Sequence, residues 1–410
     1  MSESVVGGRY LRLFGERTGI IKGISHLSPD RGDPPVYVCS PDLTDVSELC
    51  GVDRDVDVSG VSGKGFTVEQ SLLTCIGETA ERYCYYYPEP TSELTSGSYA
   101  EVSDRHETIP YEYLKAFNVG PETGELTPET TLDWAAGTSL LDGEPILVPD
   151  ALVWYHPERT DRYLVSTSNG CAAARTARTA VSRSILEAVE RDALLRSWCR
   201  QSSPPRLTDV PDEVAPYVSE FTERGHDVEF YALPSPVDVP VLGCLVRNGD
   251  GSLPNCVFAC SADSTVAGAM TSALTEAGQG WAMAATATWD YDVETINERE
   301  RFEEFEENFL YYSCGEGTEH LLAFLDGDET ARTDRFNEVE TLEALVGRLN
   351  DAGCSPVMFD LTVRDVRDAG LTVTRVVVPE LLPLTPPSDL PTDHPDLADD
   401  EVTELAHPLG

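Results

Sequence analysis

The chain has 410 residues, 41% of them hydrophobic, which is enough to bury the core of one large domain or two ordinary ones. Its 72 acidic and 29 basic residues give a formal net charge of −43. The hydrophobic content excludes a disordered acidic tail, and no apolar run reaches the roughly 18 residues of a membrane-spanning helix. Without a signal peptide at the start, we expect a soluble, cytoplasmic protein that binds neither membrane nor nucleic acid.

Lysine is rare in this chain. Only Lys22, Lys64 and Lys115 are lysines, and the remaining Lys+Arg total is arginine. Such an acidic, lysine-poor surface resembles that of cytosolic proteins from salt-loving archaea. In molar salt the Debye length falls to about 3 Å, so the repulsion between surface carboxylates is screened. We interpret the net charge as the mark of a halophilic environment and not of a substrate.

Cysteine and histidine give no metal or disulfide pattern. The 11 cysteines contain no CxxC pair, and the 7 histidines are scattered without an HExxH motif. In a long chain without a secretion signal, this usage favours free and mostly buried thiols.

The first part of the chain leads into a helix. Residues 1–60 contain short apolar runs broken by Gly, Pro and Asp, which predict strands and loops of the same domain. Apolar residues then recur at a spacing of 3.6 over 67–87, which predicts a helix. Lys64, between two glycines, precedes this helix, and a glycine turn at a helix N-terminus can bind an anion. The spacing is not that of a Walker A loop, and an ordinary surface turn is the alternative.

Two copies of an ExxER motif lie on predicted helices, the first on 67–87 and the second on 172–199. Residues three apart share one face of a helix, so each copy can direct two carboxylates at one point. Four convergent carboxylates would hold Mg²⁺, and Mg²⁺ implies a polyphosphate. The alternative is an accident of glutamate abundance. The carboxylates are those of Glu78, Glu81, Glu187 and Glu190.

The remaining elements alternate without strict βαβ regularity, which predicts an α+β fold. A third helix over 265–285 carries Glu276 in a setting like those of the two ExxE copies, so three similar helices would face a common centre. The other predicted helices are 293–308 and 338–352. The predicted strands are 146–148, 152–154, 241–246, 255–259, 357–362 and 371–378. We expect one domain over 61–381 and, at 382–410, an acidic, proline-rich tail that loses order.

The motifs, taken in order, resemble the YcaO family. Gly63-Lys64-Gly65 precedes the first ExxE motif, and Ser168-Asn169-Gly170 precedes the second. This order is more specific than any one motif. Residues 134–141, 143–153, 273–280, 359–362 and 375–379 match as well. The resemblance covers about residues 15–385, and it is strongest to the cyclodehydratase branch called SagD-like.

The resemblance implies a YcaO-type ATP-binding fold with antiparallel or mixed sheets, in which the helices carry the ExxE motifs. It implies that the four glutamates bind Mg²⁺ against the triphosphate of ATP. Without divalent ions between them, four carboxylates would repel that anion strongly. The side chains implied to contact ATP are those of Lys64, Thr74, Arg82, Asn169, Arg175 and Arg191.

The resemblance also implies an activity. YcaO proteins phosphorylate the oxygen of a peptide backbone amide. A Cys, Ser or Thr side chain of a ribosomally made peptide or protein then attacks the amide carbon. The bond from that carbon to the phosphorylated oxygen breaks, phosphate leaves, and an azoline ring remains. An external sulfide would give a thioamide instead. The sequence identifies no catalytic base. A separate partner that binds a leader peptide or delivers sulfur is expected, and a homodimer is a fair expectation.

Several positions depart from the family pattern. Ala174, Arg175 and Thr179 follow the Ser-Asn-Gly turn where the family commonly has Gly, Asn and an acid, and Trp281 stands where a phosphate-binding arginine is often found. We hypothesise that Arg175 supplies the positive charge that is lost at Trp281. The alternative to an active enzyme is a degenerate YcaO fold that serves as a non-catalytic, peptide-docking scaffold.

Overall fold

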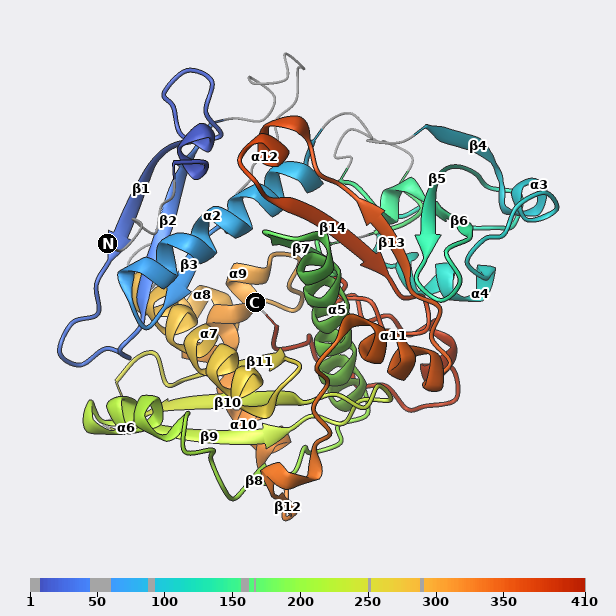
Figure 1. The fold of residues 1–410 in the computed structure, drawn as a ribbon. Coiled ribbons are helices and arrows are strands. Elements are labelled where there is room, and N and C mark those ends of the chain that lie inside the picture. The colour runs from blue at the N-terminus through green and yellow to red at the C-terminus, as the bar shows by residue number, and fades with distance from the viewer. Residues whose placement is uncertain are drawn as a thin grey trace.

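The fold is built on three β-sheets with helices packed between and around them (Figure 1). The computed structural model describes residues 8–44, 60–87, 93–155, 162–165, 167–249, 252–287 and 291–409. Helices and strands are interspersed along the chain, and one sheet contains both parallel and antiparallel pairs. The predicted α+β class with antiparallel or mixed sheets is therefore confirmed.

The first sheet has three antiparallel strands in the order β1-β2-β3. They are β1 (Ile21–Leu27), β2 (Tyr37–Leu43) and β3 (Gly63–Gly65). The second sheet has the order β11-β10-β9-β8-β12, with β8 and β12 parallel. Its strands are β8 (Arg206–Leu207), β9 (His226–Ala232), β10 (Val241–Asn248), β11 (Cys256–Ala262) and β12 (Thr330–Ala331).

The third sheet has the order β4-β5-β13-β14-β7, and β6 pairs with β5. This sheet joins strands that lie far apart in the sequence, because β14 pairs with β7 and β13 pairs with β5. Its strands are β4 (Leu94–Ser98), β5 (Thr131–Ser139), β6 (Pro145–Pro149), β7 (Cys171–Ala174), β13 (Val357–Asp360) and β14 (Thr372–Val377).

Three long helices each connect a different pair of sheets (Figure 1). Helix α2 (Val68–Tyr85) packs against β2 and β3 and also against β7 and β14. Helix α5 (Ala177–Cys199) packs against β7 and β14 and against β10 and β11. Helix α7 (Val266–Ala287) packs against β10 and β11 and against β2 and β3. The three helices therefore surround one region where all three sheets come together.

The remaining helices are short and lie around this frame (Figure 1). They are α3 (Tyr99–Ser103), α4 (Tyr111–Leu114), α6 (Ala215–Glu223), α8 (Val293–Asn297), α9 (Phe305–Cys314), α10 (Gly317–Leu325), α11 (Leu342–Asp351) and α12 (Arg364–Asp368). Single turns of 3-10 helix are Tyr10–Leu13, Lys115–Phe117, Asp150–Leu152, Thr333–Arg335 and Pro395–Leu397.

Three predicted elements differ from the structure. Helix α5 begins at Ala177 and not at residue 172, because Cys171–Ala174 pairs with β14 and the hydroxyl of Thr176 caps the helix by accepting a hydrogen bond from Thr179 N at 3.2 Å. The strand predicted over 152–154 is wrong, because the chain there follows a turn of 3-10 helix. The acidic helix predicted over 293–308 is two helices, separated where Phe302 is buried and its N–H donates to Ser388 Oγ at 2.8 Å.

The prediction that the chain loses order after residue 382 is wrong. Leu382, Leu390 and Leu397 are buried against Leu195 and Cys199 at the end of α5. The prediction failed because it was based on the acidic, proline-rich composition and not on these leucines. Their burial stabilises a segment that forms few backbone hydrogen bonds to strands.

Buried polar contacts fix the last residues of this segment. Asn308 Nδ2 donates to the carbonyls of His407 and Leu409, at 2.8 and 3.1 Å. The imidazole of His407 is bonded through Nε2 to Thr385 O at 2.9 Å.

His407 makes stability depend on pH. Burial lowers the pKa of its imidazole from 6.5 to about 4. Between these values the unfolded chain binds a proton that the folded chain does not, so stability falls as the pH falls through this window. We expect this residue to remove about 3 kcal/mol of unfolding free energy between about pH 7 and pH 4. Denaturant titrations of wild type and His407→Gln, whose amide can still donate to Thr385, measure the difference. Parallel pH profiles would contradict it.

Two simpler predictions concern thiols and membranes. The ten cysteines within the described ranges are all free and buried, as predicted. Among the described residues, the structure contains no helix with the length and apolar character needed to span a membrane.

Candidate active site

The glutamates of both ExxE motifs face the region enclosed by the three long helices. Burial raises the pKa of Glu81, and the nearby charges of Glu187 and Glu78 raise it further, which places carboxylates of α2 and α5 in electrostatic contact. Glu276 of α7 also raises the pKa of Glu190. The structure therefore brings five carboxylates from three helices to one centre.

Burial also shifts the carboxylates of α5. Burial raises the pKa of Glu187 to about 7 and that of Glu190 to about 8. Glu190 accepts a hydrogen bond from the backbone N–H of Ala262 at 3.1 Å, and its other oxygen lies 3.9 Å from Cys260 Sγ. Desolvation disfavours the ionised form of these carboxylates. Cations bound nearby would therefore be needed to neutralise them.

Basic side chains pair with these glutamates one by one. Arg82 Nη2 lies 3.7 Å from Glu78 Oε1, and Arg191 Nη1 lies 3.3 Å from Glu190 Oε1. Each arginine is thus next to a carboxylate of its own motif. Lys64 Nζ donates to Glu276 Oε1 at 2.7 Å. Three of the predicted ATP ligands therefore lie at the acidic centre.

A fourth cation, Arg375, was not predicted as a site residue. It lies on β14, is 4% exposed, and its guanidinium stacks 5.3 Å from the centre of the Tyr85 ring. Its charge lowers the pKa of both Glu81 and Glu187. The signal available in the sequence was one charged residue inside a strand of Val and Thr. Glu276 was noticed in the sequence through the repeat but not as a site residue.

The Gly63-Lys64-Gly65 segment is strand β3, not a free loop. Lys64 pairs with Val38 of β2. The hydroxyl of Thr74 accepts from Lys64 N and lies within donating distance of Lys64 O, both at 2.8 Å. Thr74, predicted to contact ATP, is thus engaged in holding the backbone of Lys64 against α2.

Gly63 has no room for a side chain, because a Cβ there would overlap the backbone of Ser71 and Cys75. We expect Gly63→Ala to separate β3 from α2 and to cost about 2 to 3 kcal/mol of unfolding free energy. Gly77→Ala on α2 is the control, because a Cβ there meets nothing within 4 Å. This substitution should raise the unfolding free energy by about 0.5 to 1 kcal/mol. Chemical denaturation measures both. Equal effects of the two substitutions would refute the steric argument.

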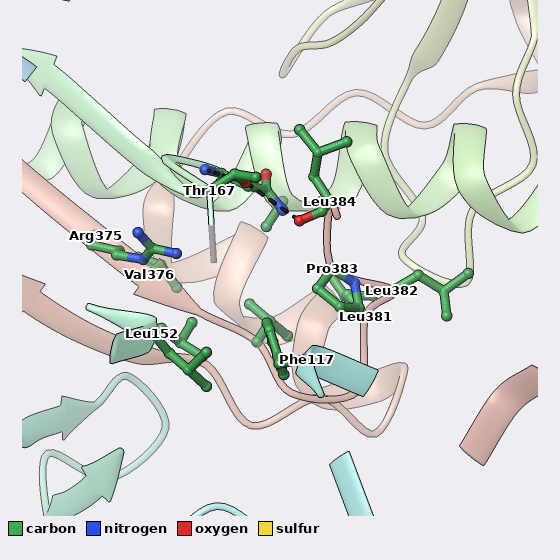
Figure 2. A pocket seen from close by; sticks show the side chains of 13 residues that line it. Phe117, Leu152, Thr167, Arg375, Val376, Leu381, Leu382, Pro383 and Leu384 are labelled. Atoms are coloured by element: carbon green, nitrogen blue, oxygen red, sulfur yellow. Dashed lines mark hydrogen bonds between the residues drawn. The ribbon is translucent and has the colours of Figure 1, made fainter. Parts of the chain in front are cut away.

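The Ser-Asn-Gly turn borders a small cavity beside the acidic centre. Figure 2 shows Arg375 and Thr167 on its wall together with Phe117 and the 381–384 segment. The cavity measures about 30 Å³ and is also lined by Asn169. Asn169 Oδ1 is buried and has no hydrogen-bond partner within the described ranges. Gly170 adopts a φ of +78°, which favours glycine at the end of the turn.

Two positions that depart from the family pattern, Arg175 and Trp281, lie in different surroundings. Arg175 is exposed between β7 and the start of α5. The indole of Trp281 is buried, with its ring centre 4.6 Å from that of His226. Trp281 therefore fills the apolar core beneath α7. The compensation of its missing charge by Arg175 stays a prediction.

The donor set fits Mg²⁺ and a polyphosphate in its chemistry. Carboxylate oxygens are the ligands that Mg²⁺ prefers, and the buried Asn169 Oδ1 and Arg191 Nε lack hydrogen-bond partners among the described residues. Within those residues, however, no three acidic or sulfur or imidazole groups are assembled as a metal site. Glu276, Glu78 and Glu190 instead pair with Lys64, Arg82 and Arg191.

The fold resembles those of solved heterocyclases. A heterocyclase in complex with substrate and cofactor aligns with a TM-score of 0.72 and 20% identity over 98% of this chain, which spans only 56% of that protein's length. The YcaO protein from Methanopyrus kandleri, bound with AMPPCP and Mg²⁺, aligns with a TM-score of 0.62 and 24% identity, covering 88% of this chain and 86% of its own. The E. coli microcin synthetase McbBCD complex gives a TM-score of 0.62 at 14% identity, covering 88% and 87%.

Sequence comparison gives the same assignment. An uncharacterized protein of Methanothermobacter thermautotrophicus is 24% identical over 397 residues, which is 90% of this chain and 92% of that protein. Residues 62–382 match the model of the YcaO cyclodehydratases, described as ATP- and Mg²⁺-binding. The chain therefore belongs to the YcaO family, as its motifs predicted, and is an ATP-dependent YcaO-type enzyme whose cofactors are ATP and Mg²⁺.

Proposed function

We propose that this enzyme uses ATP and Mg²⁺ to phosphorylate the oxygen of a backbone amide in a ribosomally made peptide or protein. The observation that carries the proposal is the convergence of Glu276 and the two ExxE motifs on one centre that also holds Lys64, Arg82 and Arg191. Solved neighbours described as a heterocyclase with substrate and as a YcaO protein with AMPPCP support it.

Each group of residues has a separate task in this proposal. The four ExxE glutamates would hold Mg²⁺, which reduces the repulsion between them and the triphosphate, while ATP supplies the phosphoryl group. Lys64, Arg82 and Arg191 would bind phosphate oxygens, and Asn169 Oδ1 would accept a hydrogen bond from the nucleotide. Arg175, at the N-terminus of α5, would add positive charge at the edge of the site. The residues thus orient the reactants and stabilise charge, as in other phosphoryl transfers.

The product that we favour is an azoline, formed when a Cys, Ser or Thr side chain attacks the activated amide. The SagD-like motifs support this choice over a thioamide. We also propose that a separate protein presents the substrate, since a structural neighbour is a multi-protein synthetase complex. If the partner instead delivers sulfur, the product would be the thioamide. We further propose that the enzyme is adapted to high salt in the cytoplasm and that it dimerises.

Calorimetry in molar KCl tests the proposal. We expect the folded protein, verified by circular dichroism, to bind AMPPCP in the presence of Mg²⁺. No binding by folded protein would overturn the enzymatic proposal and favour the scaffold, for which the absence of the phosphate-binding arginine at Trp281 is the supporting observation.

A further inference from the structure

Lys64 occupies the position of a counter-ion within the acidic centre. Its Nζ donates to Glu276 of α7 at 2.7 Å, with the two side chains 26% and 32% exposed. The charges of Glu78 on α2 and Glu190 on α5 act on the same ammonium and raise its pKa against the effect of burial. One carboxylate from each of the three long helices therefore acts on a single protein cation.

The backbone of Lys64 is fixed, but its side chain has freedom to move. Pairing with Val38 and the hydrogen bonds to Thr74 hold the peptide units of β3 in place. The side chain is a four-carbon stem that ends in a point charge with rotatable donors. It can exchange one oxygen partner for another within reach without any change of β3.

The choice of lysine at this position is informative. Lys22 and Lys115 are exposed, and Lys64 alone among the three lysines forms an ion pair at the acidic centre. Arginine, which otherwise supplies the positive charge of this chain, would bind a carboxylate through two parallel hydrogen bonds of fixed geometry. A lysine ammonium is a compact cation on a flexible stem, and it can leave its carboxylate when another cation neutralises the centre.

We propose that Lys64 is a positioning residue that supplies positive charge to the acidic centre before the metal does: its ammonium stays on Glu276 until a divalent cation binds to the neighbouring ExxE glutamates, and it is then released toward the nucleotide phosphates. This inference rests on the proposed function of the site. It gives a function to the ion pair between Lys64 and Glu276.

The exchange predicts opposite effects on two ligands. Lys64 competes with the metal when no nucleotide is present and attracts the phosphates when it is. Removing its charge should tighten the binding of Mg²⁺ alone and weaken the binding of Mg-AMPPCP. A loss of structure at the site would weaken both. The exchange also makes metal and nucleotide binding mutually reinforcing, because affinity coupling is reciprocal.

Titration calorimetry of Lys64→Met separates these effects. MgCl₂ alone, and AMPPCP with saturating MgCl₂, are titrated into wild type and variant in molar KCl at one fixed pH. We expect the Kd for Mg²⁺ alone to fall at least about fivefold and the Kd for Mg-AMPPCP to rise at least about fivefold. Lys115→Met, which removes an exposed lysine, is the matched control and should change neither constant.

The outcomes distinguish this inference from the function on which it rests. If wild type binds Mg-AMPPCP but Lys64→Met leaves the Mg²⁺ affinity unchanged or lowers it, the exchange is refuted and the proposed function stands. If folded wild type binds no Mg-AMPPCP, both are refuted. Lys64→Arg keeps the charge and can bind the carboxylate through two hydrogen bonds, so it should not tighten the binding of Mg²⁺. A tightening by Lys64→Arg as large as that by Lys64→Met would also overturn the inference.

Discussion

Glu81→Gln and Glu187→Gln are each expected to raise the Kd for Mg-AMPPCP at least about a hundredfold and to lower ATP turnover by about a thousandfold or more. Each substitution keeps the shape of the side chain and removes one negative charge from the proposed metal site. The two glutamates come from different helices, and the charge of Glu187 raises the pKa of Glu81. Calorimetry and phosphate release measure the two effects.

Glu69→Gln is the matched control for this prediction. Glu69 lies in the first turn of α2 and is exposed, so the substitution removes the same charge from the same helix outside the centre. We expect its affinity and turnover to stay within about twofold of wild type. If Glu81→Gln and Glu187→Gln bind Mg-AMPPCP as tightly as Glu69→Gln, the carboxylates do not hold the metal and the proposed function loses its main support.

The second large effect concerns stability. Asp192 follows the second ExxE motif and is 0% exposed. Its carboxylate accepts from Arg196 Nη2 at 2.9 Å and from the backbone N–H of Leu382 at 2.8 Å. Asp192→Ala would leave that N–H and the Nε and Nη2 of Arg196 without their acceptor, while Arg196 Nη1 keeps its partner Asp396 at 2.8 Å. We expect the substitution to cost about 3 kcal/mol of unfolding free energy. Equilibrium denaturation in molar KCl measures the loss.

Asp192→Asn tests the origin of that loss. The amide oxygen can still accept from Leu382, while the charge next to Arg196 is removed. We therefore expect Asp192→Asn to lose less stability than Asp192→Ala. A loss of less than about 1 kcal/mol for both variants would mean that the contact between α5 and the 382 segment contributes little.

Local sequence patterns predicted the three long helices because the signals lie within them. The 3.6-residue period of α2 gave a helix over 67–87, against Val68–Tyr85 in the structure. The alanines of Cys171–Ala174 favour a helix on their own, yet they form a strand because β14 lies beside them. The buried leucines after residue 382 were missed for the same reason, since their partners are on α5.

The site was predictable to the extent that its residues lie close in sequence. Glu78 and Glu81 are three residues apart, and this spacing by itself places both on one face of a helix. Lys64 and Glu276 are 212 residues apart in the chain, so no local sequence pattern could predict their ion pair. Arg375 likewise acts through tertiary contacts, from a strand whose neighbours come from distant segments.

The arrangement of the three long helices places the acidic centre where the three sheets are held together. Each helix rests on two sheets, and all three sheets contribute to the walls around the five glutamates. Repulsion among those glutamates therefore destabilises the packing of all three sheets and not only the conformation of a single loop. Cations that neutralise the centre should hold the three sheets together, so Mg²⁺ is expected to stabilise the folded chain through this centre.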